Sequence, residues 1–231
     1  MNDTGIITFA NQKGGVGKST LCAMFATYLT GKGHSVAIFD TDPQQSIAKK
    51  RASDMEVYAG CPVPYAVYSF RLSSEPALLS LIENIRGSTH FDFVLFDSVG
   101  SLTDQGLVAL FVNSDYVITP FHYDDLNIPP TAETVALIVT LRKKMGPEMT
   151  ARHFLIPNFH VIGAGTAEEK ERWEEAELQF SKLVTVTPYV TRRKKMERFS
   201  TMSEMDEQML LVTPAFDAIY EELVATKKPE R

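Results

Sequence analysis

Short apolar runs of strand length alternate along the chain with segments whose apolar residues recur at helical spacing. The runs V-A-I-F and F-V-L-F are apolar on both faces, which is typical of parallel strands covered by helices on either side. The alternation predicts an α/β fold, a doubly wound and mostly parallel β-sheet with helices on both faces. Strands are expected at residues 6–10, 36–39, 65–70, 93–96, 116–118, 154–156 and 184–187.

The segments between these strands carry the helical pattern. The helix after the first strand is expected to end at Gly31 and Gly33, because glycine favours helix ends. The last helix is expected to begin with Thr213 as its N-cap and Pro214 in its first turn. No repeat or linker interrupts the pattern, so residues 1–231 are expected to form a single domain. Further helices are expected at residues 44–54, around 78–85, at 131–145 and at 167–182.

The composition is that of an ordinary globular domain with a slight excess of acid. The chain has 231 residues, 44% of them hydrophobic, and a formal net charge of −6, so no overall basic character points to nucleic acid. Cys22 and Cys61 have neither metal-ligand nor disulfide-framework spacing, which fits a reducing compartment. We see no secretory leader and no apolar run of membrane-helix length. A soluble, cytoplasmic protein with Cys22 in its core is therefore expected.

The most specific feature is the segment 11–20, N-Q-K-G-G-V-G-K-S-T, which follows the first expected strand and opens the first helix. This is the context of a phosphate-binding loop, in which backbone N–H groups and a helix N-terminus attract phosphate oxygens. Glycines let the backbone approach the ligand closely. Lys18 would reach the β- and γ-phosphates, and the Ser19 hydroxyl would hold Mg²⁺.

The loop departs from the generic pattern G-x-x-x-x-G-K-[ST] at one position. Counting back from Gly17, the usual first glycine is replaced by Gln12, and a second lysine, Lys13, stands beside it. This K-G-G-x-G-K-[ST] variant is called a deviant Walker A motif and is stricter than the generic loop. We therefore interpret it as a nucleotide-binding signature rather than a chance glycine-rich turn.

Two of the expected strands end in acidic residues. The strand at 36–39 runs into Asp40 and Asp42, which face the same side of an extended segment, and the strand at 93–96 runs into Asp97. Parallel strands present their carboxyl ends at one edge, so these carboxylates should meet the phosphate loop. Asp97 has the position of a Walker B carboxylate, usually held to the metal through water. An aspartate after a strand is otherwise often a helix cap, and for Asp40 this alternative stays open.

Taken in order, K-G-G-V-G-K-S, D-T-D-P-Q-Q and F-D-F-V-L-F-D resemble the motifs of the ParA/MinD group of deviant Walker A P-loop ATPases, and D-x-D-P-Q resembles the ParA branch, the DNA-partitioning ATPases. The resemblance implies an Mg²⁺-dependent ATPase that hydrolyses ATP to ADP and phosphate. It implies that Lys13 crosses an ATP-dependent homodimer to the partner's phosphates, beside the catalytic residues Lys18 and Asp42, of which Asp42 orients the attacking water. The implied phosphate ligands are Gly14, Gly15, Val16, Gly17, Lys18, Ser19 and Thr20, and the implied metal-site residues are Ser19, Asp40 and Asp97.

The same resemblance assigns two base-binding positions. Asn158, after the strand at 154–156, matches an asparagine that contacts adenine in relatives, and Pro188 matches a loop that covers the base. Asparagine after a strand is also a common turn former, so both interpretations of Asn158 stay open. After Asp97 the chain runs S-V-G-S, where relatives have a small residue followed by prolines, so this loop is expected to differ in shape.

The most basic run lies in the C-terminal third of the chain. Relatives in the ParA branch bind DNA non-specifically through basic residues in this region, so the resemblance implies a DNA-binding patch, together with a small DNA-binding activator protein. The alternative is an exposed basic loop balanced by nearby acids. The acidic last helix argues against binding to a membrane surface. The patch would consist of Arg192, Arg193, Lys194, Lys195 and Arg198.

These features predict an ATP-dependent dimerising switch that acts in DNA partitioning, or in positioning a plasmid, chromosome or mobile element. A second hypothesis is a nucleotide-gated adaptor that positions a protein machine and does not retain DNA. A third is an ATP-dependent synthetase on the same scaffold. Such an enzyme needs a substrate pocket with carboxylate- or amine-binding groups of its own, and the sequence shows no such cluster.

Overall fold

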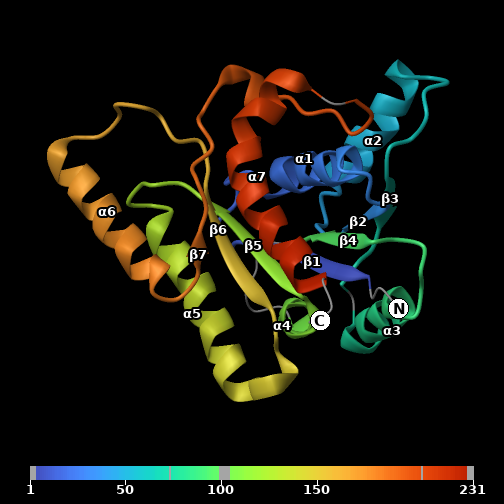
Figure 1. The fold of residues 1–231 in the computed structure, drawn as a ribbon, viewed down its shortest axis with the longest axis horizontal. Helices are drawn as coiled ribbons and strands as arrows, with labels where there is room; N and C mark the ends of the chain where they lie inside the picture. Colours follow the sequence, from blue (N-terminus) through green and yellow to red (C-terminus); the bar gives the residue numbers. More distant parts are fainter. Residues whose placement is uncertain (1–3, 73, 99–104, 204, 228–231) are drawn as a thin grey trace.

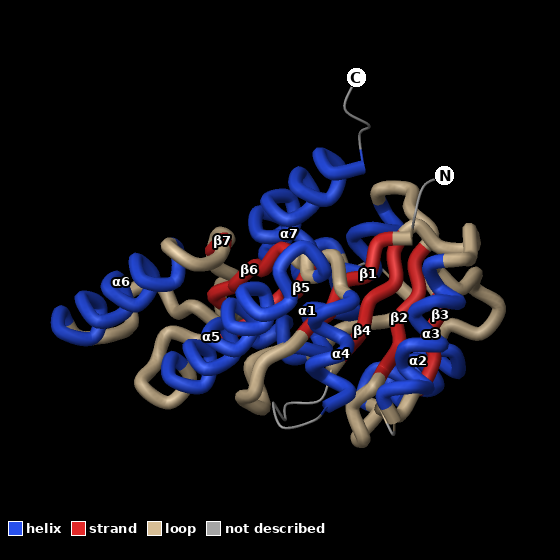
Figure 2. The backbone as a smooth tube through the Cα atoms, turned by 90° about the horizontal axis from the view of Figure 1, so that it is seen from below, coloured by secondary structure: helices blue, strands red, loops and turns tan. Residues whose placement is uncertain are grey.

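The computed structural model describes residues 4–72, 74–98, 105–203 and 205–227. Within these ranges seven strands form one sheet in the order β3-β2-β4-β1-β5-β6-β7, and every neighbouring pair is parallel. Figure 2 shows the strands side by side, with β3 and β7 at the two edges. The predicted doubly wound, parallel α/β fold is confirmed. The strands are β1 Gly5–Phe9, β2 Val36–Asp40, β3 Ala66–Ser69, β4 Phe93–Asp97, β5 Tyr116–Phe121, β6 Arg152–Pro157 and β7 Thr185–Val186.

Helices cover both faces of this sheet. On one face α1, α2 and α7 enclose a core, with α7 alongside α1 (Figure 1). On the other face α3, α4 and α5 enclose a second core, and α6 packs through Phe180 against β5 and β6. The helices are α1 Lys18–Gly31, α2 Ser46–Val57, α3 Glu75–Arg86, α4 Gln105–Asn113, α5 Ile128–Met145, α6 Ala167–Ser181 and α7 Asp206–Lys227, and short 3₁₀ turns lie at η1 Gly146–Glu148 and η2 Lys194–Glu197.

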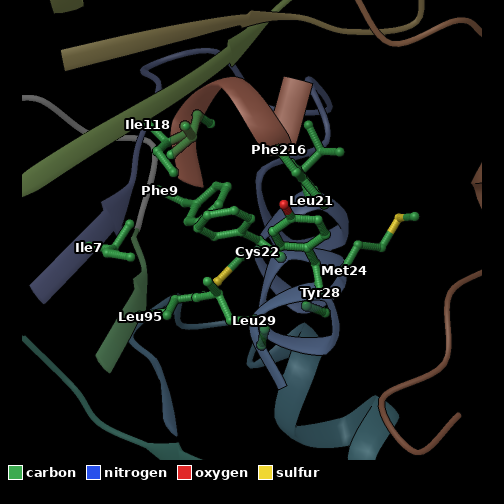
Figure 3. Close-up of a cluster of buried hydrophobic side chains, with 14 of the residues drawn as sticks. Ile7, Phe9, Leu21, Cys22, Met24, Tyr28, Leu29, Leu95, Ile118 and Phe216 are labelled. Atoms are coloured by element: carbon green, nitrogen blue, oxygen red, sulfur yellow. The ribbon is translucent and has the colours of Figure 1, made fainter. Parts of the chain in front are cut away.

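Successive residues of each central strand point into opposite cores, as the two-residue period of a strand requires. In β1, Ile7 and Phe9 pack toward α1 and α7, whereas Ile6 packs toward α3 and α4. Figure 3 shows the α1 side, where Cys22 and Phe216 lie with these side chains. The predicted core position of Cys22 is confirmed. Because both faces are packed, the loops at the carboxyl edge of the sheet stand on rigid support.

The pairing register brings the ends of the three central strands level. Phe9, at the end of β1, pairs with Asp97 of β4, and Asp97 pairs in turn with Asp40 of β2. The loop that follows β1 and the two carboxylates therefore meet at one edge of the sheet, where parallel α/β proteins bind their ligands.

The expected start of the last helix is wrong. α7 begins at Asp206, so Pro214 lies inside the helix instead of in its first turn. The Thr213 hydroxyl donates to the Met209 carbonyl at 2.7 Å, a bond along the helix rather than an N-cap. Pro214 removes the hydrogen bond to the Leu210 carbonyl, and Leu210 is 75% exposed, so the loss falls on the solvent side.

The structure also contains α4, which the apolar pattern does not predict. Its sequence, Q-G-L-V-A-L-F-V-N, is a nearly continuous apolar run without helical spacing, because the helix is buried against the sheet. None of the helices that the structure describes is both long enough and apolar enough to cross a bilayer.

Candidate nucleotide-binding site

The phosphate loop connects β1 to α1. Its glycines are required for two reasons, positive φ angles and close packing against a neighbouring loop. Gly15 and Gly17 have φ values of +79° and +94°, a region that side chains with a Cβ rarely adopt. A Cβ built on Gly14 or Gly15 would meet no atom within 4 Å, so the loop opens outward there. A Cβ on Gly17 would lie 2.3 Å from the Asn158 amide nitrogen. Glycine at 17 therefore allows a neighbouring loop to pack directly onto the phosphate loop.

Two asparagine side chains hold this loop in place. Asn158, buried at the end of β6, donates to the Val16 carbonyl at 2.8 Å. Asn11, also buried, donates to the Pro120 carbonyl at 2.8 Å and accepts from the Lys13 N–H at 3.0 Å. The sequence pattern missed the supporting role of Asn11, whose only local signal is its place as the first polar residue after β1.

The two lysines of the loop stand in different environments. Lys18 donates to the Lys13 carbonyl at 3.3 Å, and burial lowers the pKa of its ammonium, while Asp97 and Asp42 oppose that shift. Lys13 is half-buried, and within the described part of the chain its ammonium has no hydrogen-bond or ion-pair partner. Lys18 is thus oriented inside its own loop, whereas no described residue pairs with the Lys13 ammonium.

Asp97 is a buried carboxylate that the surrounding protein does not satisfy. It is fully buried, and neither of its oxygens has a hydrogen-bond partner within the described residues. Burial raises the pKa of Asp97 to about 7, with Asp40 and Asp42 adding to the rise and Ser19 and Lys18 opposing it. An unsatisfied acid of this kind is costly in an empty site and is stabilised when a cation binds.

Asp40 and Asp42 each accept backbone hydrogen bonds near the start of α2, and Asp40 also has an oxygen without a partner among the described residues. Asp40 accepts from the Ile47 and Ala48 N–H groups, each at 3.0 Å, so one oxygen caps the first turn of α2, while its other oxygen is buried without a partner in the described chain. Burial raises the pKa of Asp40. Asp42, which is half-buried, accepts from the Gln44 N–H at 2.8 Å. The helix-cap alternative for Asp40 therefore describes one of its two oxygens.

The residues present fit an Mg²⁺ ion that is completed by phosphate and water. Magnesium takes oxygen ligands and keeps several waters. The three carboxylate oxygens of Asp40 and Asp97 that have no partner among the described residues lie at the loop edge of the sheet. Within the described residues no group of three or more His, Cys, Asp or Glu side chains could hold a metal alone. An ion at this edge would therefore need ligands from the nucleotide and solvent.

The remaining predicted residues lie between β7 and α7. Pro188 is exposed in the segment after β7. Within the basic run, Arg193 and Lys194 are exposed, but Lys195 forms an ion pair with Glu207. The run is thus accessible but partly balanced by acid. The S-V-G-S loop that was expected to differ in shape lies mostly outside the described residues.

A glycine-rich loop that opens a helix, beside buried carboxylates at neighbouring ends of parallel strands, defines a P-loop nucleotide-binding protein. The chain belongs to the CobQ/CobB/MinD/ParA nucleotide binding domain family, which matches residues 7–208. The resemblance to the ParA/MinD group is confirmed.

Individual relatives share this fold at low sequence identity. The chain is 27% identical over 146 residues to "Maintenance of carboxysome distribution protein A" of Halothiobacillus neapolitanus, an alignment that covers 62% of each protein and thus less than two thirds of that relative. The solved ATP complex of a McdA variant from Cyanothece has a TM-score of 0.75 at 15% identity and covers 96% of both chains. A plasmid partition protein from Borrelia burgdorferi has a TM-score of 0.68 at 20% identity, over 95% of this chain and 99% of that one.

Proposed function

We propose that the chain is an Mg²⁺-dependent ATPase that dimerises on ATP and partitions or positions a cargo. The observation that carries this proposal is the pairing of the phosphate loop with two level, buried carboxylates, Asp40 and Asp97, whose oxygens lack protein partners in the described chain. Such oxygens fit the metal and water shell that accompany a nucleoside triphosphate. The ATP complex of the McdA variant, which shares the fold, supports ATP as the nucleotide.

The loop residues divide the work of phosphoryl transfer. Backbone N–H groups from Gly14 to Thr20 hold the phosphates, and Lys18 offsets charge on the β- and γ-phosphate oxygens. Ser19 and Asp97 would hold an Mg²⁺ ion, which would supply positive charge against the same phosphate oxygens. Asp42, anchored in the turn before α2, orients the attacking water.

Dimerisation follows from Lys13. Its ammonium has no partner in the described part of its own chain, and the loop opens outward at Gly14 and Gly15. A second copy placed face to face would receive this cation at its phosphates, where charge builds in the transition state, as an arginine finger does. Hydrolysis would then depend on dimerisation, so the lifetime of the ATP-bound dimer would set how long the protein stays in its active state.

The exposed basic run from Arg192 to Lys195 supports non-specific DNA binding, which a dimer would double, and a small DNA-binding protein would act as activator. A protein assembly is the second candidate cargo, and the carboxysome-distribution relative supports it.

The dimer is tested by Asp42→Ala and Lys13→Ala. Asp42→Ala should bind ATP and persist as a dimer in size-exclusion chromatography, because hydrolysis stops. Lys13→Ala should bind ATP but hydrolyse it at least ~100-fold more slowly, as removal of a transition-state cation does. Lys49→Ala, an exposed lysine of α2, is the control and should behave like the natural chain. A persistent Asp42→Ala monomer with bound ATP would contradict the proposal.

The cargo is tested by retention of the ATP-bound protein on random duplex DNA. Retention should fall steeply with salt, and the double change Arg193→Ala and Lys194→Ala should lower the log–log salt slope by about 2 for each protomer of the dimer. If ATP binds normally but no salt-sensitive retention occurs, the protein-assembly candidate replaces DNA.

A further inference from the structure

The first turns of α5 contact the start of the phosphate loop through two threonines to which the proposed function assigns no role. Thr131 and Thr134 are both fully buried. Thr131 Oγ1 accepts a hydrogen bond from the Asn11 amide nitrogen at 3.1 Å, although the two residues are 120 positions apart in the sequence. Thr134 Oγ1 accepts from the Gln12 N–H at 3.4 Å. α5 therefore contacts the loop directly before Lys13, at the position where the motif departs from the generic pattern.

Each of these threonine hydroxyls donates its single proton along α5. Thr131 Oγ1 donates to the Asn127 carbonyl at 2.7 Å, and Thr134 Oγ1 donates to the Pro130 carbonyl at 3.0 Å. A hydroxyl has one proton to donate and two lone pairs that can accept. Toward the loop both oxygens can therefore only accept, which matches the two N–H donors that the loop presents to them.

These contacts determine which way the Asn11 amide points. Its nitrogen donates to two acceptors, the Pro120 carbonyl at 2.8 Å and Thr131 Oγ1 at 3.1 Å. A rotated amide would place its oxygen, which cannot donate, against both acceptors. The Asn11 oxygen therefore faces the loop, where it accepts from the Lys13 N–H at 3.0 Å. Because Asn11 is buried, an amide hydrogen left without an acceptor would be costly.

The Lys13 peptide connects this network to both lysines of the loop. Its N–H is held by Asn11, and its carbonyl accepts from Lys18 Nζ at 3.3 Å. The Lys13 side chain is long and flexible, so the backbone at Lys13 sets the point from which its ammonium reaches outward. An error of about 1 Å in placing a group that takes part in catalysis can cost about 100-fold in rate. Restraint of the Lys13 backbone therefore matters for a cation that has to reach a second subunit.

We infer that Thr131 is a positioning residue for Lys13 and acts through the Asn11 amide. The inference rests on the proposed function, in which the Lys13 ammonium reaches the phosphates of a second copy of the chain. Thr134 supports the same segment through a longer contact and contributes less. The first turns of α5 are thereby connected to the dimer-dependent step, so a change there alters hydrolysis while the residues that bind the nucleotide stay the same.

Thr131→Val removes the acceptor while nearly keeping the shape of the side chain. In the nucleotide-free protein it should speed hydrogen exchange of the Lys13 N–H, measured by ¹H–¹⁵N NMR, about 10-fold, because the Asn11 amide loses one of its two acceptors. Thr131→Ala, which removes the same acceptor in a smaller side chain, should give the same result. Thr131→Ser keeps the hydroxyl, and Thr140→Val changes an exposed threonine of α5, so both should exchange like the natural chain. Unchanged exchange at Lys13 in Thr131→Val and Thr131→Ala would overturn the inference, whether or not the protein hydrolyses ATP.

ATP turnover at saturating Mg²⁺–ATP tests whether the contact acts through Lys13. Thr131→Val should lower turnover at least ~10-fold, while its affinity for ADP, measured by calorimetry, stays within about 2-fold of the natural chain. In a Lys13→Ala background the same change should cause no further loss, because its effect is transmitted by Lys13. Equal losses in both backgrounds, or a weakened affinity for ADP, would show a general role in the loop and overturn the inference. Failure of the proposed function is recognised separately, because Lys13→Ala alone would then hydrolyse ATP like the natural chain.

Discussion

Asp97 and Asp54 are both buried aspartates, and the protein treats them in opposite ways. Asp97 ends β4 with neither oxygen paired within the described residues, and burial raises its pKa to about 7. Burial also acts to raise the pKa of Asp54, in α2, but hydrogen bonds from Lys50 and Thr201 outweigh it and hold the pKa below its usual value. The Thr201 N–H and hydroxyl lie 2.7 and 2.9 Å from the Asp54 carboxylate.

The contrast distinguishes Asp54, whose charge stabilises the fold, from Asp97, whose charge is available to bind a ligand. Next to Asp54, Arg51 donates to the Thr201 carbonyl at 2.8 Å and to the Tyr65 carbonyl at 2.6 Å, so this buried polar network is satisfied from within the chain. The oxygens of Asp97 have no such partners among the described residues, so a bound ion, water or ligand has to supply them. A buried acid with a raised pKa and no partner is a functional-site signal, whereas one with a lowered pKa and several donors is not.

The largest expected effect comes from removing the cation that faces the unsatisfied carboxylates. Lys18→Ala should lower the affinity for Mg²⁺–ATP at least ~100-fold, because its charge-assisted contacts to phosphate are lost. The fold should remain intact, since burial already disfavours this charge. Calorimetry measures the affinity, and Lys49→Ala serves as the control. Normal affinity in Lys18→Ala would remove the phosphate loop from the proposed function.

Asp97→Asn should stabilise the nucleotide-free protein at pH 8. The pKa of Asp97 is raised on folding, from 3.8 to about 7, so its contribution to stability is complete below pH 3.8 and is lost as the pH rises through 7. The asparagine variant avoids that loss, which is at most about 4 kcal/mol for three pKa units. Urea unfolding at pH 5 and pH 8 measures the free energy of unfolding. The advantage of the variant should shrink toward pH 5, and a pH-independent difference would contradict this account.

Asp54→Ala should have the opposite sign and destabilise the protein by about 3 kcal/mol at pH 7. The change leaves the buried Thr201 N–H and hydroxyl without an acceptor. Lys50→Ala removes only the more exposed arm of the same cluster and should cost less than about 1 kcal/mol. The affinity for nucleotide should not change in either variant. Equal destabilisation by both changes would show that the Thr201 contacts carry little energy.

The sequence predicts most of the fold and the phosphate end of the site. The short apolar runs predict all seven strands of the described sheet, because parallel strands covered on both faces carry apolar residues on both faces. The motif around Lys18 and the strand-end position of Asp97 also lie within short segments. The structure places both at the same edge, as expected.

What the sequence does not predict depends on competition between signals or on contacts between distant segments. Thr213 and Pro214 form a good local start signal, but the buried positions of Met209 and Val212 extend α7 toward the N-terminus. The satisfaction of Asp54 by Thr201 arises only after folding. No pattern along the chain shows that Asp54 is buried and satisfied by Thr201.

Because the two oxygens of Asp40 have different environments, replacement by alanine and replacement by asparagine test different things. Alanine would remove both oxygens at once, the one that accepts from the first turn of α2 and the one that faces the expected metal position. Its effect could therefore not be ascribed to either loss. Asparagine keeps one oxygen to accept from Ile47 and Ala48 and turns an amide hydrogen toward the edge where a positive ion would sit. Asp40→Asn therefore leaves the helix anchored while it selectively repels the metal.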